Sequence, residues 1–270
     1  MVLRRRVVVH EFLCESDGRL GDLIVYRSAA SCEPTKAKPY LEPPEVAIWR
    51  MHDMIERICI ATNTSDCEFY LGGSDNFRYK IYPEYKGNRT KERPTYLESC
   101  RELLVTQYKA TIVNGMETDD MLGIRQTQLD GASRICSLDK DLLQIPGQHF
   151  NWVNQEFKLV SPLDGLKTFY KQLILGDKTD NIPGYDGALR GSCPKFIQKL
   201  QEPIDDMVDE ADMYWYVKDC YDNEHNDYSA ELAIQIMNRN AQLLYILKRE
   251  EEFWQPPGQK DVSEASSLVS

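Results

Sequence analysis

The sequence of 270 residues predicts an α/β fold with a mainly parallel central sheet, followed by a helical module. Three times, the first 160 residues repeat a short apolar run, a turn and a group of acidic residues. Helical segments at 44–61 and 96–109 alternate with these runs, as in parallel sheets whose strands are joined by helices. Beyond residue 161 the strand signals fade and helical spacing takes over, so the two parts of the chain differ in architecture.

The three predicted strands are 67–71, 111–113 and 135–138, and each is followed by carboxylates: Asp75, then Glu117, Asp119 and Asp120, then Asp139 and Asp141. Ligands of open α/β sheets bind outside the carboxyl ends of the strands, so we expect all three groups at one edge. Each group alone also fits a structural role. Acidic residues suit the first turn of a helix, and Asp139 fits the cap of a helix that begins at Asp141.

The second half contains predicted helices at 162–175 and 229–247, the latter with a plausible cap. Between them, the turn-rich segment 176–194 carries Asp177 and Asp180 in GDKTDNIPGYDG. In isolation this segment reads as a turn punctuated by Asn, Pro and Gly. We therefore predict an α/β domain at 1–160, with a loop or arch around 78–98, a helical module at 161–254 and a loose tail at 255–270.

Carboxylates crowded at one edge repel one another unless cations neutralise them. Ligand sets made only of oxygen select hard cations, so we expect Mg²⁺ or Mn²⁺. Two such ions about 4 Å apart are a known device for in-line attack on a phosphodiester. The acidic edge thus predicts a two-metal phosphodiester hydrolase.

The charge distribution indicates a nucleic-acid substrate although the net charge is −11. The segment 78–93 (RYKIYPEYKGNRTKER) carries a local charge of +4, which leaves −15 for the remainder. Its tyrosines alternate with cations, the combination that commonly grips single-stranded nucleic acid, although a solvated loop is the plainer alternative. Because the segment directly follows Asp75, we expect it to overhang the acidic edge.

The composition argues against a zinc site and a membrane protein. The eight cysteines are scattered without any C-x-x-C pair, and reduced thiols are the better interpretation. No apolar run approaches the roughly 20 residues of a spanning helix, and the N-terminal apolar stretch is too short for a signal peptide. We expect a cytoplasmic protein, in the host cytoplasm if the protein is viral.

With these residues in view, the chain resembles the 5′ nuclease family of bacteriophage 5′-3′ exonucleases, flap endonucleases and the 5′ nuclease domain of bacterial DNA polymerase I. The resemblance is closest to the phage-type branch. It extends from about Leu20 to Lys199 and rests on four motifs in order: GGSDNFRYKIYPEYKGNR, GMETDDMLG, SLDKDLLQI and GDKTDNIPGYDG.

The resemblance implies a PIN-like nuclease domain, an arch or loop over the active site and a helix-three-turn-helix that follows duplex DNA. The substrate implied is DNA with 5′ ends or flaps. Position by position, it implies a first metal cluster (Asp75, Glu117, Asp119, Asp120), a second cluster (Asp139, Asp141, Asp177, Asp180) and scissile-phosphate contacts by Lys86 and Arg89. It further implies that Tyr85 stacks the terminal base and that Arg78, Arg190 and Lys195 contact DNA.

Two departures from the family pattern leave alternatives open. Leu20 stands at the family's first aspartate, so either Asp17 substitutes or that ligand is missing, and residues 1–19 look unlike the family's first strand. The glycines after DNIPG are spaced more widely than in the family, which argues against its potassium site. A catalytically weakened nucleic-acid-binding protein is therefore the second hypothesis, and a PIN-like ribonuclease is the third.

Overall fold

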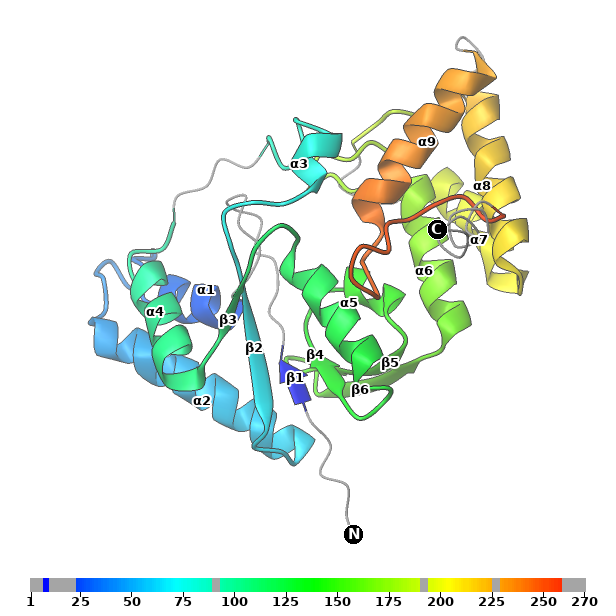
Figure 1. The fold of residues 1–270 in the computed structure, drawn as a ribbon. Coiled ribbons are helices and arrows are strands. Elements are labelled where there is room, and N and C mark those ends of the chain that lie inside the picture. The colour runs from blue at the N-terminus through cyan, green and yellow to red at the C-terminus, as the bar shows by residue number, and fades with distance from the viewer. Residues whose placement is uncertain (1–6, 10–22, 89–92, 190–193, 225–228, 259–270) are drawn as a thin grey trace, which may run out of the picture. The chain divides into compact units, whose positions relative to one another are not determined.

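A computed structural model describes residues 7–9, 23–88, 93–189, 194–224 and 229–258 (Figure 1). Within these ranges the chain forms two compact units. Unit 1 draws on Met1–Asn76, Arg89–Val160 and Lys248–Glu250, and unit 2 on Phe77–Asn88, Ser161–Leu247 and Glu251–Ser270. The segment Phe77–Asn88 thus clusters with the helical second half, although the sequence analysis assigned it to the first domain.

Unit 1 contains a six-stranded sheet in the order β3-β2-β1-β4-β5-β6. The strands are β1 (Val7–Val9), β2 (Cys67–Gly72), β3 (Thr111–Val113), β4 (Arg134–Cys136), β5 (Gly147–Asn151) and β6 (Glu156–Val160). All neighbouring pairs are parallel except the terminal β5–β6 hairpin. The predicted α/β class with a mainly parallel sheet is confirmed.

The strand β1 corrects the expectation that residues 1–19 are unlike the family's first strand. Val7–Val9 pairs with both β2 and β4. Three consecutive β-branched residues favour an extended backbone, and a strand with neighbours on both edges needs no alternation of polar and apolar residues. The arginines that precede this run obscured the signal.

Helices cover the sheet of unit 1 on two sides. The helices α1 (Leu23–Ala30), α2 (Pro44–Thr62) and α4 (Leu97–Tyr108) pack together, and α5 (Thr118–Gln128) packs against β1, β2 and β4. Figure 1 shows α5 on the opposite side of the strands from α2 and α4. Fully buried Leu71, Leu122 and Ile135 form part of the resulting core. A short 3₁₀ turn, η1 (Asp141–Gln144), follows β4.

Unit 2 is helical, with α3 (Arg78–Ile81), α6 (Pro162–Leu175), α7 (Lys195–Asp206), α8 (Glu210–Glu224) and α9 (Ala230–Leu244). Helix α6 packs against α7, α8 and α9, and α3 packs against α9. Ser161 and Ser229 cap α6 and α9 with their side-chain oxygens, as the sequence predicts for α9. The helix-three-turn-helix implied by the resemblance stays a prediction.

Candidate nuclease site

Asp75 lies just beyond the carboxyl end of β2, in a turn held against β3. A side chain at Gly73 would have its Cβ 2.5 Å from the carbonyl oxygen of Val113, so only glycine permits this approach. The Gly73 N–H donates to that carbonyl at 2.8 Å, and the Gly115 N–H donates to the Asp75 carboxylate at 3.0 Å. Asp75 is exposed and is fixed beside the segment that leads into α5.

The second acidic group occupies the start of α5. Glu117 is the N-cap residue, and Asp119 and Asp120 lie in the first turn, where the helix dipole favours negative charge. The Asp120 carboxylate accepts the Glu117 N–H at 3.0 Å, one half of a capping box. These three carboxylates are buried, with Asp120 fully inaccessible. The structural role considered for this motif is therefore real, but it does not explain why three buried carboxylates share one turn.

The third group follows β4, the other neighbour of β1. The Asp139 side chain accepts the backbone N–H of Asp141 at the start of η1, although Lys140 and not Asp139 occupies the N-cap position of this turn. The Asp139 N–H in turn bonds the Ser137 hydroxyl at 3.0 Å. Both aspartates are half-buried. Because β2, β3 and β4 are parallel, all three acidic groups of unit 1 follow carboxyl ends of strands, the sheet edge at which α/β proteins bind ligands.

Every candidate ligand atom of these carboxylates is an oxygen, and oxygen ligands suit a hard cation. Across the described ranges, however, no group of three or more Asp, Glu, His or Cys side chains is arranged to hold a metal ion. The donor set therefore fits Mg²⁺ or Mn²⁺, while a closed set of three ligands is not formed by the described side chains.

Asp177 and Asp180 belong to unit 2, in the turn after α6. The Asp177 carboxylate accepts the Thr179 N–H at 2.7 Å, and the Asp177 backbone pairs with Ile182 across the turn. Burial, and secondarily the nearby Asp180 charge, raises the pKa of Asp177 to about 6. Two acidic residues predicted to bind metal therefore share a tightly hydrogen-bonded turn.

The segment Phe77–Asn88 is bound to this turn by side chains for which the family resemblance implies contacts with DNA. The Tyr85 hydroxyl donates to the Asp180 carboxylate at 2.7 Å, and the Lys86 ammonium lies 3.4 Å from the same oxygen. The Lys86 N–H also donates to the Asp180 carbonyl at 2.9 Å. Tyr85 and Lys86 are only 2% and 4% exposed, so in this structure both side chains are buried against the turn that contains Asp180.

Arg78 is likewise buried. Its guanidinium donates to the carbonyls of Leu243 and Tyr245 at 2.8 Å each, at the C-terminal end of α9. Free carbonyls at a helix end are natural acceptors for a cation. A DNA contact by Arg78, or base stacking by Tyr85, requires these groups to leave their partners, and both roles stay predictions.

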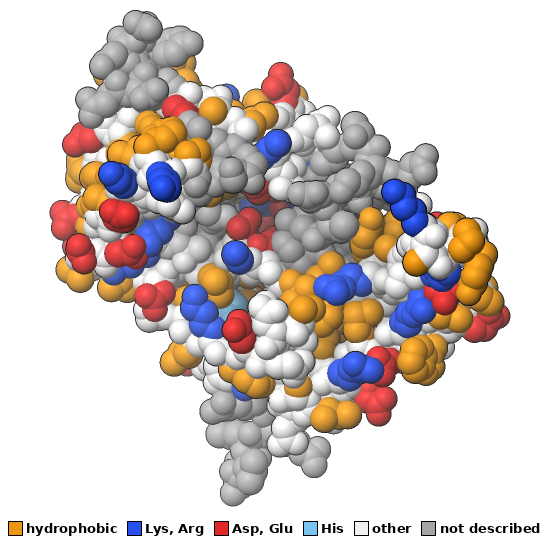
Figure 2. All heavy atoms as spheres, turned by 180° about the vertical axis from the view of Figure 1, so that it is seen from behind, with side chains coloured by type: hydrophobic (Ala, Val, Ile, Leu, Met, Phe, Trp, Pro, Cys, Tyr) orange, Lys and Arg blue, Asp and Glu red, His pale blue; other side chains and the backbone are white. Residues whose placement is uncertain are grey.

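The remaining predicted residues are exposed or lie outside the described ranges. Lys195 is exposed at the first position of α7. Arg89, Arg190, Leu20 and Asp17 fall outside the described residues. On the face seen in Figure 2, described Lys and Arg side chains are interspersed with Asp and Glu, not gathered into one patch. The described part of the chain contains no helix long and apolar enough to span a bilayer.

Three asparagines also hold parts of the candidate site in position, a role that the sequence did not predict. In unit 1, the Asn76 amide donates to Glu117 at 2.7 Å. In unit 2, the Asn88 amide donates to the Lys178 carbonyl at 2.7 Å, and the Asn181 amide to the Glu84 carbonyl at 2.8 Å. Their positions inside the DNFR, KGNR and TDNIPG motifs were the available signal, but asparagine in such a segment is equally typical of a turn.

Comparisons with known proteins point to one family. The family described as the N-terminal resolvase-like domain of 5′-3′ exonucleases matches residues 21–171. A 5′-3′ exonuclease of Buchnera aphidicola (Acyrthosiphon pisum) is 30% identical over 124 residues, which cover 40% of this chain and 43% of that protein. DNA polymerase I of Pseudomonas aeruginosa is 33% identical over 128 residues, covering 41% of this chain and 14% of the polymerase. The chain thus spans less than two thirds of these curated relatives.

A solved structure shares the fold. It is a bacteriophage T5 flap endonuclease in a complex with DNA and metal ions, with a TM-score of 0.57, 16% identity and 89% of each chain covered. At that identity the likeness concerns the fold alone. The family match covers more than half of the chain and includes all three acidic groups of unit 1. The resemblance found in the sequence is confirmed, and the chain belongs to the family of the 5′-3′ exonuclease N-terminal resolvase-like domain.

Proposed function

We propose that this protein is a metal-dependent nuclease that hydrolyses DNA phosphodiester bonds at 5′ ends or flaps. The observation that carries the proposal is the set of buried carboxylates in the first turn of α5, at the strand ends of a chain in the 5′-3′ exonuclease family. Burial of three like charges in one turn is unfavourable unless cations offset it. A divalent cation bound here offsets that repulsion, and the bound cation in turn attracts a polyanion such as DNA.

Two divalent ions, Mg²⁺ or Mn²⁺, are proposed for this site. Asp75, Glu117, Asp119 and Asp120 would hold one, and Asp139 and Asp141 with Asp177 and Asp180 would hold the other. Such ions supply an activated water and stabilise the charge on the leaving oxygen. Asn76 orients Glu117 through its amide, and the hydrogen bond from Gly115 orients Asp75. The T5 enzyme has been crystallised with metal ions, including zinc, which supports a divalent cation here.

Lys86 and Arg89 are proposed to stabilise the charge that develops on the scissile phosphate. One well-placed donor contributes on the order of 3 kcal/mol to such a transition state. The Lys86 side chain is buried beside Asp180, which holds the ammonium in a defined direction, and the Tyr85 ring lies 4.9 Å from it. Release of Lys86 from Asp180 is a required step of this proposal.

The helical second half is proposed to bind duplex DNA through Lys195, with Arg190 as a further contact. Lys195 is exposed at the N-terminal end of α7, where backbone N–H groups and the helix dipole also favour phosphate. Loss of one phosphate contact lowers the slope of log affinity against log salt by about one unit. Lys195→Ala should therefore weaken binding with little effect on the rate at saturating enzyme.

The deciding experiment measures cleavage and binding separately. A 5′-labelled duplex and a 5′-flap substrate are incubated with the protein and Mg²⁺, with excess EDTA as one control. Binding of the same substrates is measured in Ca²⁺. We expect cleavage in Mg²⁺ or Mn²⁺, no cleavage in EDTA and binding in Ca²⁺. Undiminished cleavage in EDTA would falsify the metal requirement.

A catalytically weakened DNA-binding protein is the second candidate. Leu20 occupies the position of the family's first aspartate, and no closed group of three metal ligands occurs within the described residues. This candidate predicts binding in Ca²⁺ without cleavage in Mg²⁺. Leu20→Asp is its sharpest test, because restored cleavage would identify Leu20 as the cause, and Asp17→Asn tests whether Asp17 supplies the ligand instead.

A further inference from the structure

The thiols of Cys59 and Cys67 lie close together in unit 1, at the opposite end of β2 from Asp75. Cys59 lies in the last turn of α2, and Cys67 is the first residue of β2 (Figure 1). Their sulfur atoms are 3.4 Å apart, close enough for a thiol hydrogen bond. Both cysteines are half-buried.

The turn between α2 and β2 fixes this approach. Asn63 takes a left-handed backbone with φ 53°, and the Thr64 N–H donates to the Cys59 carbonyl at 3.0 Å. Cys67 is anchored on the other side by the parallel pairing of β2 with β1. Backbone hydrogen bonds therefore hold the chain in place at both cysteines.

We propose that Cys59 and Cys67 form a redox-active dithiol, a modification site at which a small-molecule disulfide such as oxidised glutathione creates an intramolecular disulfide. This inference is independent of the proposed nuclease activity. Adjacent cysteines, one acting as nucleophile and one resolving, are the usual arrangement of such sites.

The exchange proceeds in two balanced steps. The Cys59 thiolate attacks one sulfur of oxidised glutathione, whose S–S bond breaks and releases one glutathione thiolate. Cys67 then loses its proton and attacks the Cys59 sulfur, which releases the second glutathione. Two protein thiols are oxidised by two electrons, and one glutathione disulfide is reduced to two thiols.

The assignment of Cys59 as the nucleophile follows from its environment. The hydrogen bond from Cys67 lowers the pKa of Cys59 to about 7, which favours the thiolate form of Cys59 over that of Cys67. The same hydrogen bond, together with burial, raises the pKa of Cys67. Cys67 therefore acts second, when the first thiolate has become part of the mixed disulfide.

The test uses the full chain in glutathione redox buffers, followed by an acid quench, alkylation and tryptic mass spectrometry. Both cysteines fall in the single tryptic peptide Ile58–Arg78, which contains no other cysteine. We expect the mass of this peptide to fall by two hydrogens and its cysteines to resist alkylation. Cys220, a half-buried cysteine of α8, should still react with the alkylating reagent. The link should form at least about tenfold faster in the native protein than in guanidinium, because folding holds the thiols together.

Cys59→Ser and Cys67→Ser separate the two roles, and Cys220→Ser is the matched control. Cys67→Ser should accumulate the glutathione adduct on Cys59, and Cys59→Ser should react slowly. A melting curve checks that each variant folds, and Cys59→Ala and Cys67→Ala replace any serine variant that does not. Persistent alkylation of both cysteines in oxidising buffer, or equal rates in native and unfolded protein, would overturn the proposal.

Discussion

Asp120 in unit 1 and Asp180 in unit 2 are both buried aspartates predicted to bind metal, yet their surroundings differ. Asp120 accepts a backbone N–H and shares its helical turn with Glu117 and Asp119. Asp180 receives the Tyr85 hydroxyl and an ion pair from Lys86. A buried carboxylate paired with a lysine is part of the fold, because either partner alone is a buried charge. The comparison predicts that Asp120 matters chiefly for cleavage and Asp180 chiefly for stability.

Asp120→Asn should have the largest effect on cleavage. Asparagine keeps the acceptor for the Glu117 N–H but removes one negative charge from the acidic turn. We expect the single-turnover rate to fall by about 10²- to 10³-fold, the usual consequence of removing one electrostatic group from an active site. The melting temperature should not fall, because repulsion within the turn is relieved.

Asp130→Asn is the matched control for this variant. Asp130 is an exposed aspartate just beyond the other end of α5, so its replacement changes the net charge equally without touching the turn. Equal rate losses in the two variants, or a large loss of stability in Asp120→Asn alone, would assign Asp120 to the fold.

Asp180→Asn should have the largest effect on stability. Asparagine still accepts the Tyr85 hydroxyl, but the buried Lys86 ammonium loses its ion pair with Asp180. We expect the free energy of unfolding to fall by about 3 kcal/mol in urea titrations. The double variant Asp180→Asn/Lys86→Met removes both charges and should recover most of that loss. No recovery would mean that the ion pair is not what stabilises this turn.

Asp177→Asn sharpens the comparison, because burial, and secondarily the Asp180 charge, raises the pKa of Asp177 to about 6. A carboxyl group whose pKa is higher in the folded state than its usual value of 3.8 stabilises the fold only while protonated. That stabilisation is complete below about pH 4 and is lost as the pH rises through 6. Asparagine should therefore raise stability at pH 7 by up to about 3 kcal/mol and leave it unchanged near pH 4. Urea unfolding in metal-free buffer at both pH values measures this difference, and a gain that persists at pH 4 would contradict it.

The sequence was sufficient for the elements whose signals are local. The strand Thr111–Val113 and the helix Pro162–Leu175 match their predicted bounds, and Ser229 caps α9 as expected. Acidic groups after parallel strands were also predictable, because strand direction alone puts them at one edge. The burial of Arg78, Tyr85 and Lys86 was not predictable. It depends on carbonyls of α9 and on Asp180, which are 95 to 167 residues away in the sequence.

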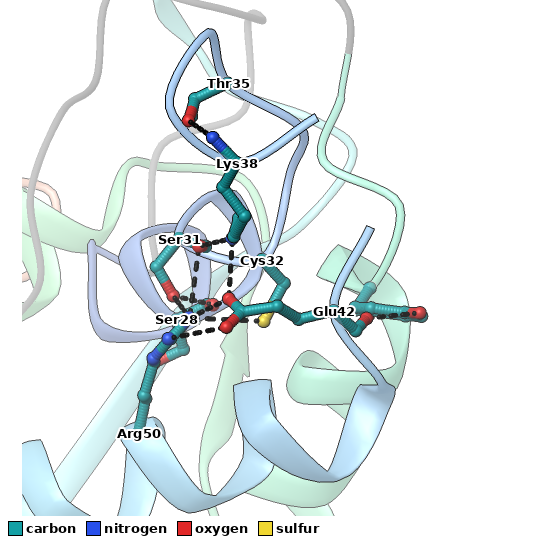
Figure 3. Close-up of polar contacts among 8 residues, drawn as sticks. Ser28, Ser31, Cys32, Thr35, Lys38, Glu42 and Arg50 are labelled. Carbon is teal, nitrogen blue, oxygen red and sulfur yellow. Dashed lines mark hydrogen bonds and ion pairs between the residues drawn. The ribbon is translucent and has the colours of Figure 1, made fainter. Parts of the chain in front are cut away.

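The smallest expected effect concerns Glu42, a carboxylate near the surface of unit 1 that is also paired with cations (Figure 3). Its oxygens accept Arg50 at 2.7 and 3.2 Å and Lys38 at 2.6 Å, and both cations also donate to the Ser31 carbonyl. This network joins the segment between α1 and α2 to the first half of α2. Hydrogen bonds from Arg50 and then Lys38 lower the pKa of Glu42 to about 2.

Glu42→Gln should therefore lower the melting temperature slightly at pH 7, since water screens a network near the surface. A carboxylate with a lowered pKa stabilises the fold above about pH 4.5 and loses that contribution as the pH falls toward 2. The difference between wild type and Glu42→Gln should vanish over the same range and shrink in high salt. Glu102→Gln, in the middle of α4 and exposed, should show neither dependence. Glu42→Gln could instead destabilise the protein as much as Asp180→Asn does. Surface and buried carboxylates paired with lysine would then not differ in this protein. The contrast between Asp120 and Asp180 would have to rest on cleavage alone.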